Sequence, residues 1–514
     1  MTIRRARGRR PNRRRGAIAL ALLAPALLSL VGCNKYGSSI ARPEDPVVLT
    51  AASTPKLLGT VPASVVGFAW NGTGWFQIPT QVDERDMVNP GQILHRATAN
   101  YAKNADGTAF KVLAYTDLAT ASAGYKGWPT YTGTDSVPTV DANDEISFLA
   151  TDTGKQIAVD TPAPADTLAS SREEVKVTDP LTSAVGFAYL FTSTSPTLTG
   201  GSGGTTKVNY QLILNASPTA DYKGTYKMGT AALAPNNSAG FNSEASNIET
   251  PSYTQQYSDR WLNSVISIAA GGASKHRILE RGRYQFAPGV CGRSEDTFDG
   301  GDTNPYEGGF LTNLSGPVRA IRSYIGANSG QYTINTDIFY PQRQDSITDL
   351  RVHAIPGVMA FDDMFDTGAE LTYSDDQNTG IPIDGVPDSI VAAHSPVWQM
   401  VSSPTEGSLV TARTVDTDIA GLQLSTYYLD QSSASPRPCT GDADAWGQNG
   451  VAIVGAGGGQ VPCTDPTRAE CPTGTVKRLS ATRFRYFEGP SLSSASAAGL
   501  AARALAPLVT TVNG

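Results

Sequence analysis

Four side chains that are close in the sequence have the types that proton transfer on an acidic sugar requires. His353 and Arg351 lie two residues apart in an alternating segment, so both would project from one face of a strand. Tyr340 and Arg343 precede them. An arginine that neutralises a carboxylate, a histidine that accepts a proton and a tyrosine that donates one would support β-elimination of an acidic polysaccharide. The alternative is that these residues form the polar outer face of a strand, and the sequence alone favours that alternative.

A second group consists of carboxylates and an amide in one polar loop. It offers the hard oxygen ligands that Ca²⁺ prefers, from Asp375, Asp376, Asn378, Asp384 and Asp388. The end of the loop, Asp384-Gly385-x-x-Asp388, resembles one calcium-binding unit of thrombospondin type 3 repeats. The resemblance implies calcium as a cofactor, but Gly380 and Pro382 occupy positions where that family has acidic ligands. A solvated acidic turn is the alternative.

Two further acidic groups have the composition of a glycosidase site, in which paired carboxylates act on the sugar bond. They are Glu295, Asp296, Asp299, Asp302 and Glu307 in one segment, and Asp362, Asp363 and Asp366 in another. The first group would also suit calcium. Hydrolysis needs two carboxyl groups about 5–9 Å apart across a cleft, which sequence spacing does not determine. Without that geometry, both groups are ordinary surface loops.

Two motif-like segments are rejected because their context is wrong. Residues 451–460 imitate a dinucleotide-binding fingerprint, but Gln460 replaces the last glycine and Val461-Pro462 follows where a helix must begin. The Gly-x-Ser-x-Gly match at residues 200–204 lies in a Ser/Thr/Gly segment without the strand-to-helix turn that a hydrolase serine needs. Neither segment predicts an activity.

Four cysteines occur in the second half of the chain: Cys291, Cys439, Cys463 and Cys471. An even number in an exported chain predicts two disulfides, with three connectivities open. We favour a local Cys463–Cys471 loop, which leaves Cys291 and Cys439 to join distant segments. A zinc site is the rival interpretation, but no Cys-x-x-Cys pair and no neighbouring histidine supports it.

The N-terminal residues have the parts of an export signal. Eight arginines and no acidic residue precede Ala17, and an apolar run of about 15 residues follows, shorter than the roughly 20 that a membrane span needs. The run ends in Leu30-Val31-Gly32-Cys33, which resembles the lipobox of bacterial lipoproteins. The resemblance implies cleavage before Cys33, acylation of that residue, and anchorage in the bacterial cell envelope, facing the periplasm or the exterior. An ordinary secretory signal with a chance cysteine is the alternative.

The charge balance limits the partners of the mature chain. Loss of the eight N-terminal arginines would take the formal net charge from −7 to about −15. Such an acidic chain is a poor partner for nucleic acid and for anionic lipid headgroups. Contact with the membrane would therefore depend on the acyl chains, and the surface would be a solvated extracellular one.

The body of the chain has the composition of a mainly β protein, because 51 glycines and 33 prolines separate many short alternating segments. In the segment 65–79, Asn71-Gly72 supplies the positive φ angles of a hairpin turn. We predict a signal peptide over 1–32, a flexible tether over 33–46, an antiparallel β-sandwich over 47–195 and a larger one over 207–514. Residues 195–206 would be a linker or hairpin loop, and residues 493–508 a short C-terminal helix.

One short motif indicates a carbohydrate-active fold. Gly316-Pro317-Val318-Arg319, at the start of a predicted strand, resembles a recurrent motif in galactose-mutarotase-like sandwiches of carbohydrate-active bacterial proteins. The resemblance covers only residues 316–322, and it implies a large supersandwich that stacks sugars on exposed aromatic rings. The candidate rings are Trp398 and Tyr324, and further candidates are Trp70, Trp75 and Trp128. The alternative, which we expect for most of these rings, is packing between sheets.

Three functions follow from these observations. We favour a lipid-anchored envelope protein that binds glycan or has a structural role, stabilised by calcium. The first alternative is a polysaccharide lyase or glycoside hydrolase that acts on extracellular polysaccharide. The second is a lipoprotein subunit of a larger envelope complex, which a large exposed apolar patch would favour.

Overall fold

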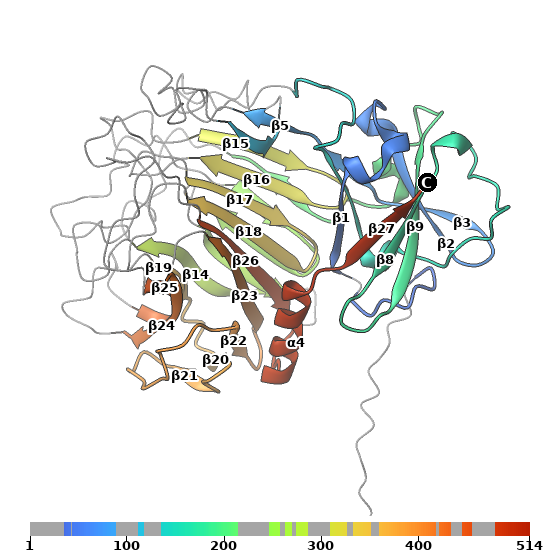
Figure 1. Cartoon of the computed structure of the whole chain (residues 1–514). Coiled ribbons are helices and arrows are strands. Elements are labelled where there is room, and N and C mark those ends of the chain that lie inside the picture. The colour runs from blue at the N-terminus through green and yellow to red at the C-terminus, as the bar shows by residue number, and fades with distance from the viewer. Residues whose placement is uncertain are drawn as a thin grey trace, which may run out of the picture. The chain divides into compact units, whose positions relative to one another are not determined.

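A computed structural model describes residues 35–42, 44–88, 111–117, 135–213, 246–257, 263–269, 274–285, 309–325, 333–350, 359–417, 421–432, 445–454 and 479–514. These residues form antiparallel β-sheets and one α-helix near the C-terminus (Figure 1). The predicted mainly β fold and C-terminal helix are therefore confirmed. Within these ranges, no helix is long and apolar enough to cross a membrane. Cys33 and the four cysteines of the predicted disulfides lie outside the described residues.

The first β-sandwich pairs a five-stranded sheet with a three-stranded one. The larger sheet has the spatial order β27 (Val509–Asn513), β8 (Glu173–Thr178), β9 (Val185–Thr192), β2 (Val65–Trp70) and β3 (Trp75–Ile78). The smaller sheet is β1 (Pro46–Thr50), β7 (Glu145–Leu149) and β4 (Gln81–Asp83), and a separate pair is β5 (Arg85–Val88) and β6 (Val112–Tyr115). Alternate side chains of the two sheets meet in one apolar core, which includes Leu49, Ile146, Val175 and Val177.

The predicted hairpin forms between β2 and β3, which pair from Gly67–Ile78 to Trp70–Trp75. At the turn, the Asn71 side-chain oxygen accepts hydrogen bonds from the backbone N–H groups of Thr73 and Gly74 at 2.8 and 2.9 Å. Gly72 has a φ of +107°, which an L side chain rarely adopts. The Asn-Gly pair is therefore required by the turn, as the sequence predicts.

The predicted division of the chain near residue 200 needs two corrections. The segment 195–206 is packed against the first sandwich and does not act as a linker. Its 3₁₀ helix, Gly200–Gly203, accepts a hydrogen bond from the Thr80 N–H, and a Cβ on Gly203 would lie 2.3 Å from the Ile78 carbonyl oxygen. Second, the last strand, β27, pairs with β8, so the C-terminus completes the first sandwich (Figure 1). The described residues from Lys35 to Gly514 belong to one compact unit.

The second β-sandwich consists of two large antiparallel sheets. The eight-stranded sheet has the order β10 (Asn209–Gln211), β11 (Ser246–Glu249), β12 (Tyr253–Tyr257), β13 (Asn263–Ala269), β14 (Lys275–Gln285), β19 (Met359–Met364), β25 (Ala445–Val454) and β24 (Gln423–Gln431). The nine-stranded sheet has the order β15 (Gly309–Ser315), β16 (Ala320–Ile325), β17 (Thr333–Phe339), β18 (Arg343–Leu350), β26 (Leu479–Glu488), β23 (Gly407–Thr417), β22 (Trp398–Ser403), β20 (Leu371–Asp375) and β21 (Ile381–Ile383).

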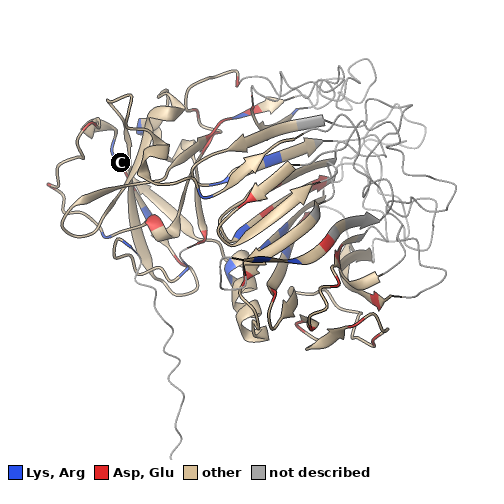
Figure 2. Ribbon diagram, turned by 180° about the vertical axis from the view of Figure 1, so that it is seen from behind, with Lys and Arg blue, Asp and Glu red and all other residues tan. Residues whose placement is uncertain are grey.

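The space between the two large sheets is apolar at one end of the strands and polar at the other. Leu409 of β23 and Phe487 of β26 belong to the apolar core that both sheets share. Because side chains of a strand alternate between its faces, Arg413 lies on the same face as Leu409, and Arg485 on the same face as Phe487. Charged residues of both signs occur on neighbouring strands of the nine-stranded sheet (Figure 2), and Arg322 of β16 and Asp337 of β17 lie 3.7 Å apart on the inner face. The interior therefore changes from hydrocarbon to charged groups along each strand.

Helix α4 (Ser494–Leu505) covers the outer face of the nine-stranded sheet (Figure 1). The Ser493 side chain caps it by accepting a hydrogen bond from the Ser496 N–H at 3.1 Å, as serine at this position commonly does. Its buried face includes Leu500 and Ala504, which pack with Trp398 and Tyr486 of the sheet. The same sheet is thus covered on both faces, by α4 and by the eight-stranded sheet.

A buried ion-pair network connects the two sandwiches. Arg319, which directly precedes β16, contacts Asp83 of β4 at 2.7 Å and Glu145 of β7 at 2.7 Å, and it is 1% exposed. The backbone N–H groups of Val318 and Arg319 both donate to the Gln81 side chain. The motif Gly316–Arg319 therefore has a structural role, because it joins the nine-stranded sheet to the three-stranded sheet of the first sandwich.

Candidate functional site

The residues predicted for β-elimination do not form an open site in the described part of the chain. Arg351 and His353 lie outside the described residues. Tyr340 is buried, its hydroxyl accepts a hydrogen bond from Arg319 at 3.3 Å, and burial raises its pKa to about 12. Arg343 is also buried and donates to Asp345 at 2.5 and 2.9 Å. Tyr340 and Arg343 therefore stabilise the interior of the protein and are not placed to meet a substrate.

The two aromatic side chains predicted to bind sugar are also buried. Trp398 is 6% exposed and packs against α4, and Tyr324 of β16 has no exposed surface. Neither ring presents a face on which a sugar could stack. These positions follow the alternative considered from the sequence, in which large aromatic residues pack between layers.

The five residues predicted to hold calcium do not meet in one cage. Asp375 accepts hydrogen bonds from the Tyr373 hydroxyl at 2.7 Å and from the backbone N–H groups of Gln377 and Asn378 at 2.8 and 2.7 Å. The Asn378 side-chain NH₂ donates to Asp375, and its oxygen accepts from the Val391 N–H at 2.8 Å. These hydrogen bonds hold Asp375 and Asn378 in place within the loop.

Asp384 and Asp388, at the other end of the predicted calcium loop, form a separate acidic pair. Burial, and next the charge of Asp384, raise the pKa of Asp388 above its usual value. Asp430 of β24 accepts hydrogen bonds from the backbone N–H groups of Asp384 and Gly385 at 2.8 and 2.9 Å. This carboxylate ties the loop to the eight-stranded sheet.

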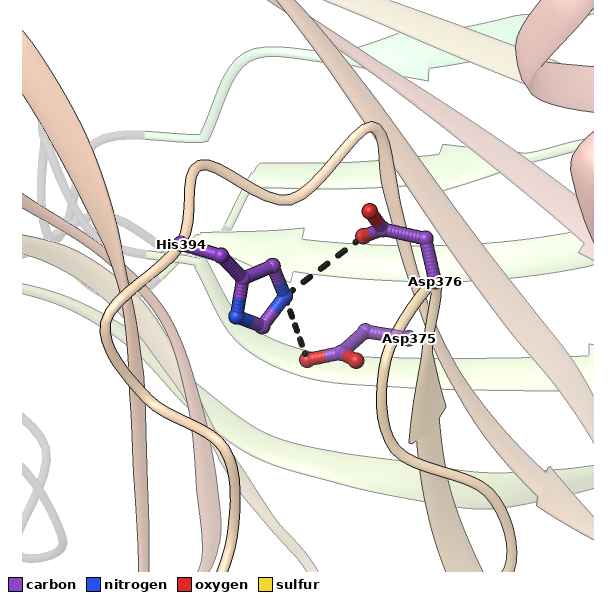
Figure 3. Close-up of side chains that lie close together, drawn as sticks. All are labelled: Asp375, Asp376 and His394. Atoms are coloured by element: carbon purple, nitrogen blue, oxygen red, sulfur yellow. Dashed lines mark ion pairs between the residues drawn. The ribbon is translucent and has the colours of Figure 1, made fainter.

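The structure instead brings His394 to Asp375 and Asp376. The His394 Nε2 atom lies 3.4 Å from the Asp375 carboxylate and 3.6 Å from that of Asp376, and the ring points between the two (Figure 3). The His394 side chain is 7% exposed. Thr426 of β24 donates its backbone N–H to the His394 carbonyl oxygen at 2.8 Å, and its hydroxyl lies 3.2 Å from Nε2. These contacts fix the loop 392–397 between the two large sheets.

Among the described residues, Asp375, Asp376 and His394 are the group whose atoms could hold a metal ion, since one atom from each lies within 4.8 Å of the others. Two carboxylates and an imidazole suit Zn²⁺ or a similar transition metal, whereas Ca²⁺ prefers oxygen ligands alone. The group does not fit the predicted calcium site. The hydrogen bonds to Asp375 and the contact of Nε2 with Thr426 are sufficient to explain the arrangement as a buried histidine–carboxylate contact.

The third acidic group of the sequence is divided between the interior and the surface. Asp362 of β19 is buried and ion-paired to Arg485, with Arg483 at 3.6 Å. Asp363 is also buried, and it accepts hydrogen bonds from the Gln448 side chain and the Trp446 N–H at 3.1 Å each. These two carboxylates therefore do not form a hydrolytic pair in an open cleft. The other acidic group, residues 295–307, lies outside the described residues.

A cavity of about 680 Å³ lies where β23, β24 and the loop 393–396 meet. It is lined by Ala393, His394, Ser395, Pro396, Arg413, Val415, Thr417, Leu422, Gln423, Leu424, Ser425 and Val454. We refer to it as the His394–Arg413 cavity. Its volume lies within the range of about 300–1,000 Å³ that is typical of small-molecule sites. Apolar groups and hydroxyls alternate on its walls, because Arg413, Val415 and Thr417 share one face of β23.

Arg413 carries the positive charge of this cavity. Its guanidinium donates a hydrogen bond to the neutral side chain of Gln399 on β22. Burial, and next the charge of Arg483 directly opposite on β26, lower the pKa of Arg413 to about 9. Among the described residues that line the cavity, none is a carboxylate. The arrangement is therefore suited to a ligand that carries a negative charge.

His394 and Arg413 were not among the residues that the sequence singled out for this site. The alternation of residues 409–414 places Arg413 on the face of Leu409. That signal existed, but it does not reveal which sheet the face would meet. His394 lies in a loop, where no periodicity indicates its direction.

Comparison with protein-family models and with curated proteins finds no match to this chain.

Proposed function

We propose that this chain is a lipid-anchored protein of the bacterial cell envelope that binds an extracellular glycan in the His394–Arg413 cavity. Acylation of Cys33 would hold the protein at the membrane, and the β-sandwiches would present the cavity to the surroundings. The observation that carries the proposal is the cavity itself, with its volume of about 680 Å³ and its mixed lining.

The lining matches the two kinds of surface that a sugar presents. Ser395 and Gln423 offer hydrogen-bond donors and acceptors to hydroxyl groups, and the Ser425 hydroxyl, which donates to the Ala392 carbonyl oxygen at 2.9 Å, offers an acceptor. Val415, Leu422, Leu424 and Val454 offer apolar contacts to the C–H faces of a ring. A few polar groups among apolar walls is the usual composition of a site that orients one small ligand.

A glycan array, read together with a depolymerisation assay on the same polysaccharides, tests this proposal. The protein is the full chain, purified in detergent so that any acyl chains are retained. Binding without new chain ends is the expected result. The substitution Ser395→Ala is expected to weaken binding several-fold, because it removes one hydroxyl from the cavity. Ser494→Ala, on α4 and outside the cavity, is the matched control and should bind as the unchanged chain does.

New unsaturated or reducing ends would instead identify the protein as a polysaccharide lyase or a glycoside hydrolase. Such a result would overturn the binding proposal and direct mutagenesis to His353 and Arg351. Absence of both binding and cleavage would remove the carbohydrate function and favour a role as a subunit of an envelope complex.

A further inference from the structure

We infer that the ligand of the His394–Arg413 cavity carries an oxyanion, and that Arg413 binds that group; the inference rests on the proposed glycan-binding function and names the class of glycan. A carboxylate of a uronic acid and a sulfate ester on a neutral sugar share this chemistry. Arginine suits both, because its planar guanidinium donates two parallel hydrogen bonds to two oxygens of one group.

The first argument is the charge around Arg413. Arg413 and Arg483 are direct cross-strand partners, and Arg485 is two residues further along β26. Like charges directly opposite on adjacent strands are destabilising. The described carboxylate that attracts Arg413, Asp362, is ion-paired to Arg485 and lies 3.6 Å from Arg483. The charge of Arg413 is therefore only partly balanced within the described part of the chain.

The second argument is the position of the negative groups nearest to the cavity. Asp375 and Asp376 face His394, and neither lines the cavity. Asp375 is engaged by Tyr373 and Asn378, and Asp376 accepts a hydrogen bond from the Val397 N–H at 3.1 Å. Their contacts with His394 turn Nε2 toward the carboxylates (Figure 3). Within the described lining, a ligand would thus meet a cation and no carboxylate.

The lowered pKa of Arg413 supports the same conclusion. In the absence of a ligand, burial and Arg483 both disfavour the charged guanidinium. A bound oxyanion would remove part of that cost, since opposite charges within about 4–6 Å favour the charged form. A residue kept at a cost to stability is typical of a binding site rather than of a core.

Two titrations of the full chain test the inference. In the first, sodium glucuronate and sodium sulfate are added, with glucose as the neutral comparison, and the melting temperature is followed. In the second, glucuronate oligomers, sulfated glucose oligomers and glucose oligomers of equal length are titrated by calorimetry. Each is repeated with Arg413→Gln, with Arg413→Lys, and with Arg503→Gln, which removes the same charge from α4 outside the cavity.

The expected result is that one acidic probe binds and its neutral counterpart binds at least tenfold more weakly. Arg413→Gln should weaken acidic binding at least tenfold and raise the melting temperature of the ligand-free chain by about 2–4 °C. Arg413→Lys should retain charge but lose the two-point contact, giving an intermediate affinity. Arg503→Gln should leave acidic binding unchanged.

The outcomes separate the two proposals. Equal binding of neutral and acidic oligomers, or unchanged acidic binding by Arg413→Gln, would overturn the oxyanion assignment and leave glycan binding intact. Stabilisation by glucuronate or sulfate that depends on Arg413, without binding of any oligomer, would support an oxyanion site and overturn the glycan function. No effect of any probe on either measurement would overturn both.

Discussion

Replacing Arg319 by methionine should destabilise the protein by about 3–5 kcal/mol, because it leaves a buried carboxylate without its cation. Arg319 donates to Asp83 at 2.8 Å through Nε, and Nη2 lies 2.7 Å from both Asp83 and Glu145. Methionine has a similar length and is apolar, so the main loss is the charge. Burial alone would raise the pKa of Glu145, but Arg319 and Arg85 lower it below its usual value.

Glu145 and Asp83 do not keep the same partners when Arg319 is replaced, and this difference sets the size of the destabilisation. Glu145 would retain Arg85 at 2.7 Å and the Tyr115 hydroxyl at 2.7 Å. Asp83, which is 3% exposed, would retain the Gln81 side-chain NH₂ at 2.7 Å. One buried carboxylate without a cation accounts for the expected loss of about 3–5 kcal/mol in the free energy of unfolding. That loss is a large share of the roughly 5–15 kcal/mol by which a typical protein is stable.

Equilibrium unfolding in urea, followed by tryptophan fluorescence and circular dichroism, measures this loss. The double variant Asp83→Asn/Arg319→Met should recover about 1–3 kcal/mol, because the stranded charge is removed. Asp83→Asn alone should reduce the stability less than Arg319→Met does, because Arg319 still forms its ion pair with Glu145. Asp83→Asn provides the test if Arg319→Met does not fold. A loss below about 1 kcal/mol for Arg319→Met, or no recovery in the double variant, would refute the reasoning.

Three further predictions concern other parts of the chain. Asp152→Asn should stabilise the protein by about 1 kcal/mol at pH 7.5 and not at pH 4. Burial raises the pKa of Asp152 to about 6, so the charge of Asp152 opposes folding as the pH rises through that value. Equilibrium unfolding at both pH values measures this difference. Gly450→Ala should destabilise the protein by at least about 2 kcal/mol, since its Cβ would lie 2.2 Å from the Ala360 carbonyl oxygen. Gly499→Ala on α4 meets no atom within 4 Å and should stabilise the protein by about 0.5–1 kcal/mol. Thermal unfolding compares the two variants. Dialysis against EDTA should change the melting temperature by less than about 1 °C, because hydrogen bonds already hold the loop at Asp375; a fall of several degrees that Ca²⁺ reverses would restore the calcium site.

The strands could be read from the sequence wherever alternation was regular. The alternation of residues 173–178 coincides with β8, and the hairpin 65–79 was predicted from Asn71-Gly72. Strand β18 was missed, because Arg343, Gln344 and Asp345 interrupt the apolar pattern. Gln344 faces the other large sheet, where its side chain donates to Asp337 at 3.0 Å, and Arg343 and Asp345 form a buried ion pair on the opposite face. Hydrophobic alternation detects only strands with an apolar face.

The location of β27 could not be predicted from local pattern either. Its residues alternate, but its pairing partner β8 is more than 300 residues earlier in the chain, and the register is set by tertiary packing. Arg42 helps to hold this return, since it donates to the Ala506 carbonyl oxygen at 3.0 and 2.9 Å and contacts Asp179 at 3.2 Å. A boundary drawn from composition near residue 200 therefore separates segments that the fold joins.

The candidate site is likewise not predictable from local pattern, because its charged residue is isolated in the sequence. The sequence directed attention to clusters of like chemistry, such as Asp375 and Asp376, because clusters are visible in a linear chain. In the fold, those carboxylates are satisfied by His394 and by their own loop, and they do not line the cavity. Arg413 is an isolated charge in its segment, and alternation shows which face it shares but not what that face meets. It lines a cavity because β23 and β24 belong to different sheets that face each other. The proposed binding function depends on which isolated side chain reaches the polar end of the sandwich, and only the pairing of the sheets determines that.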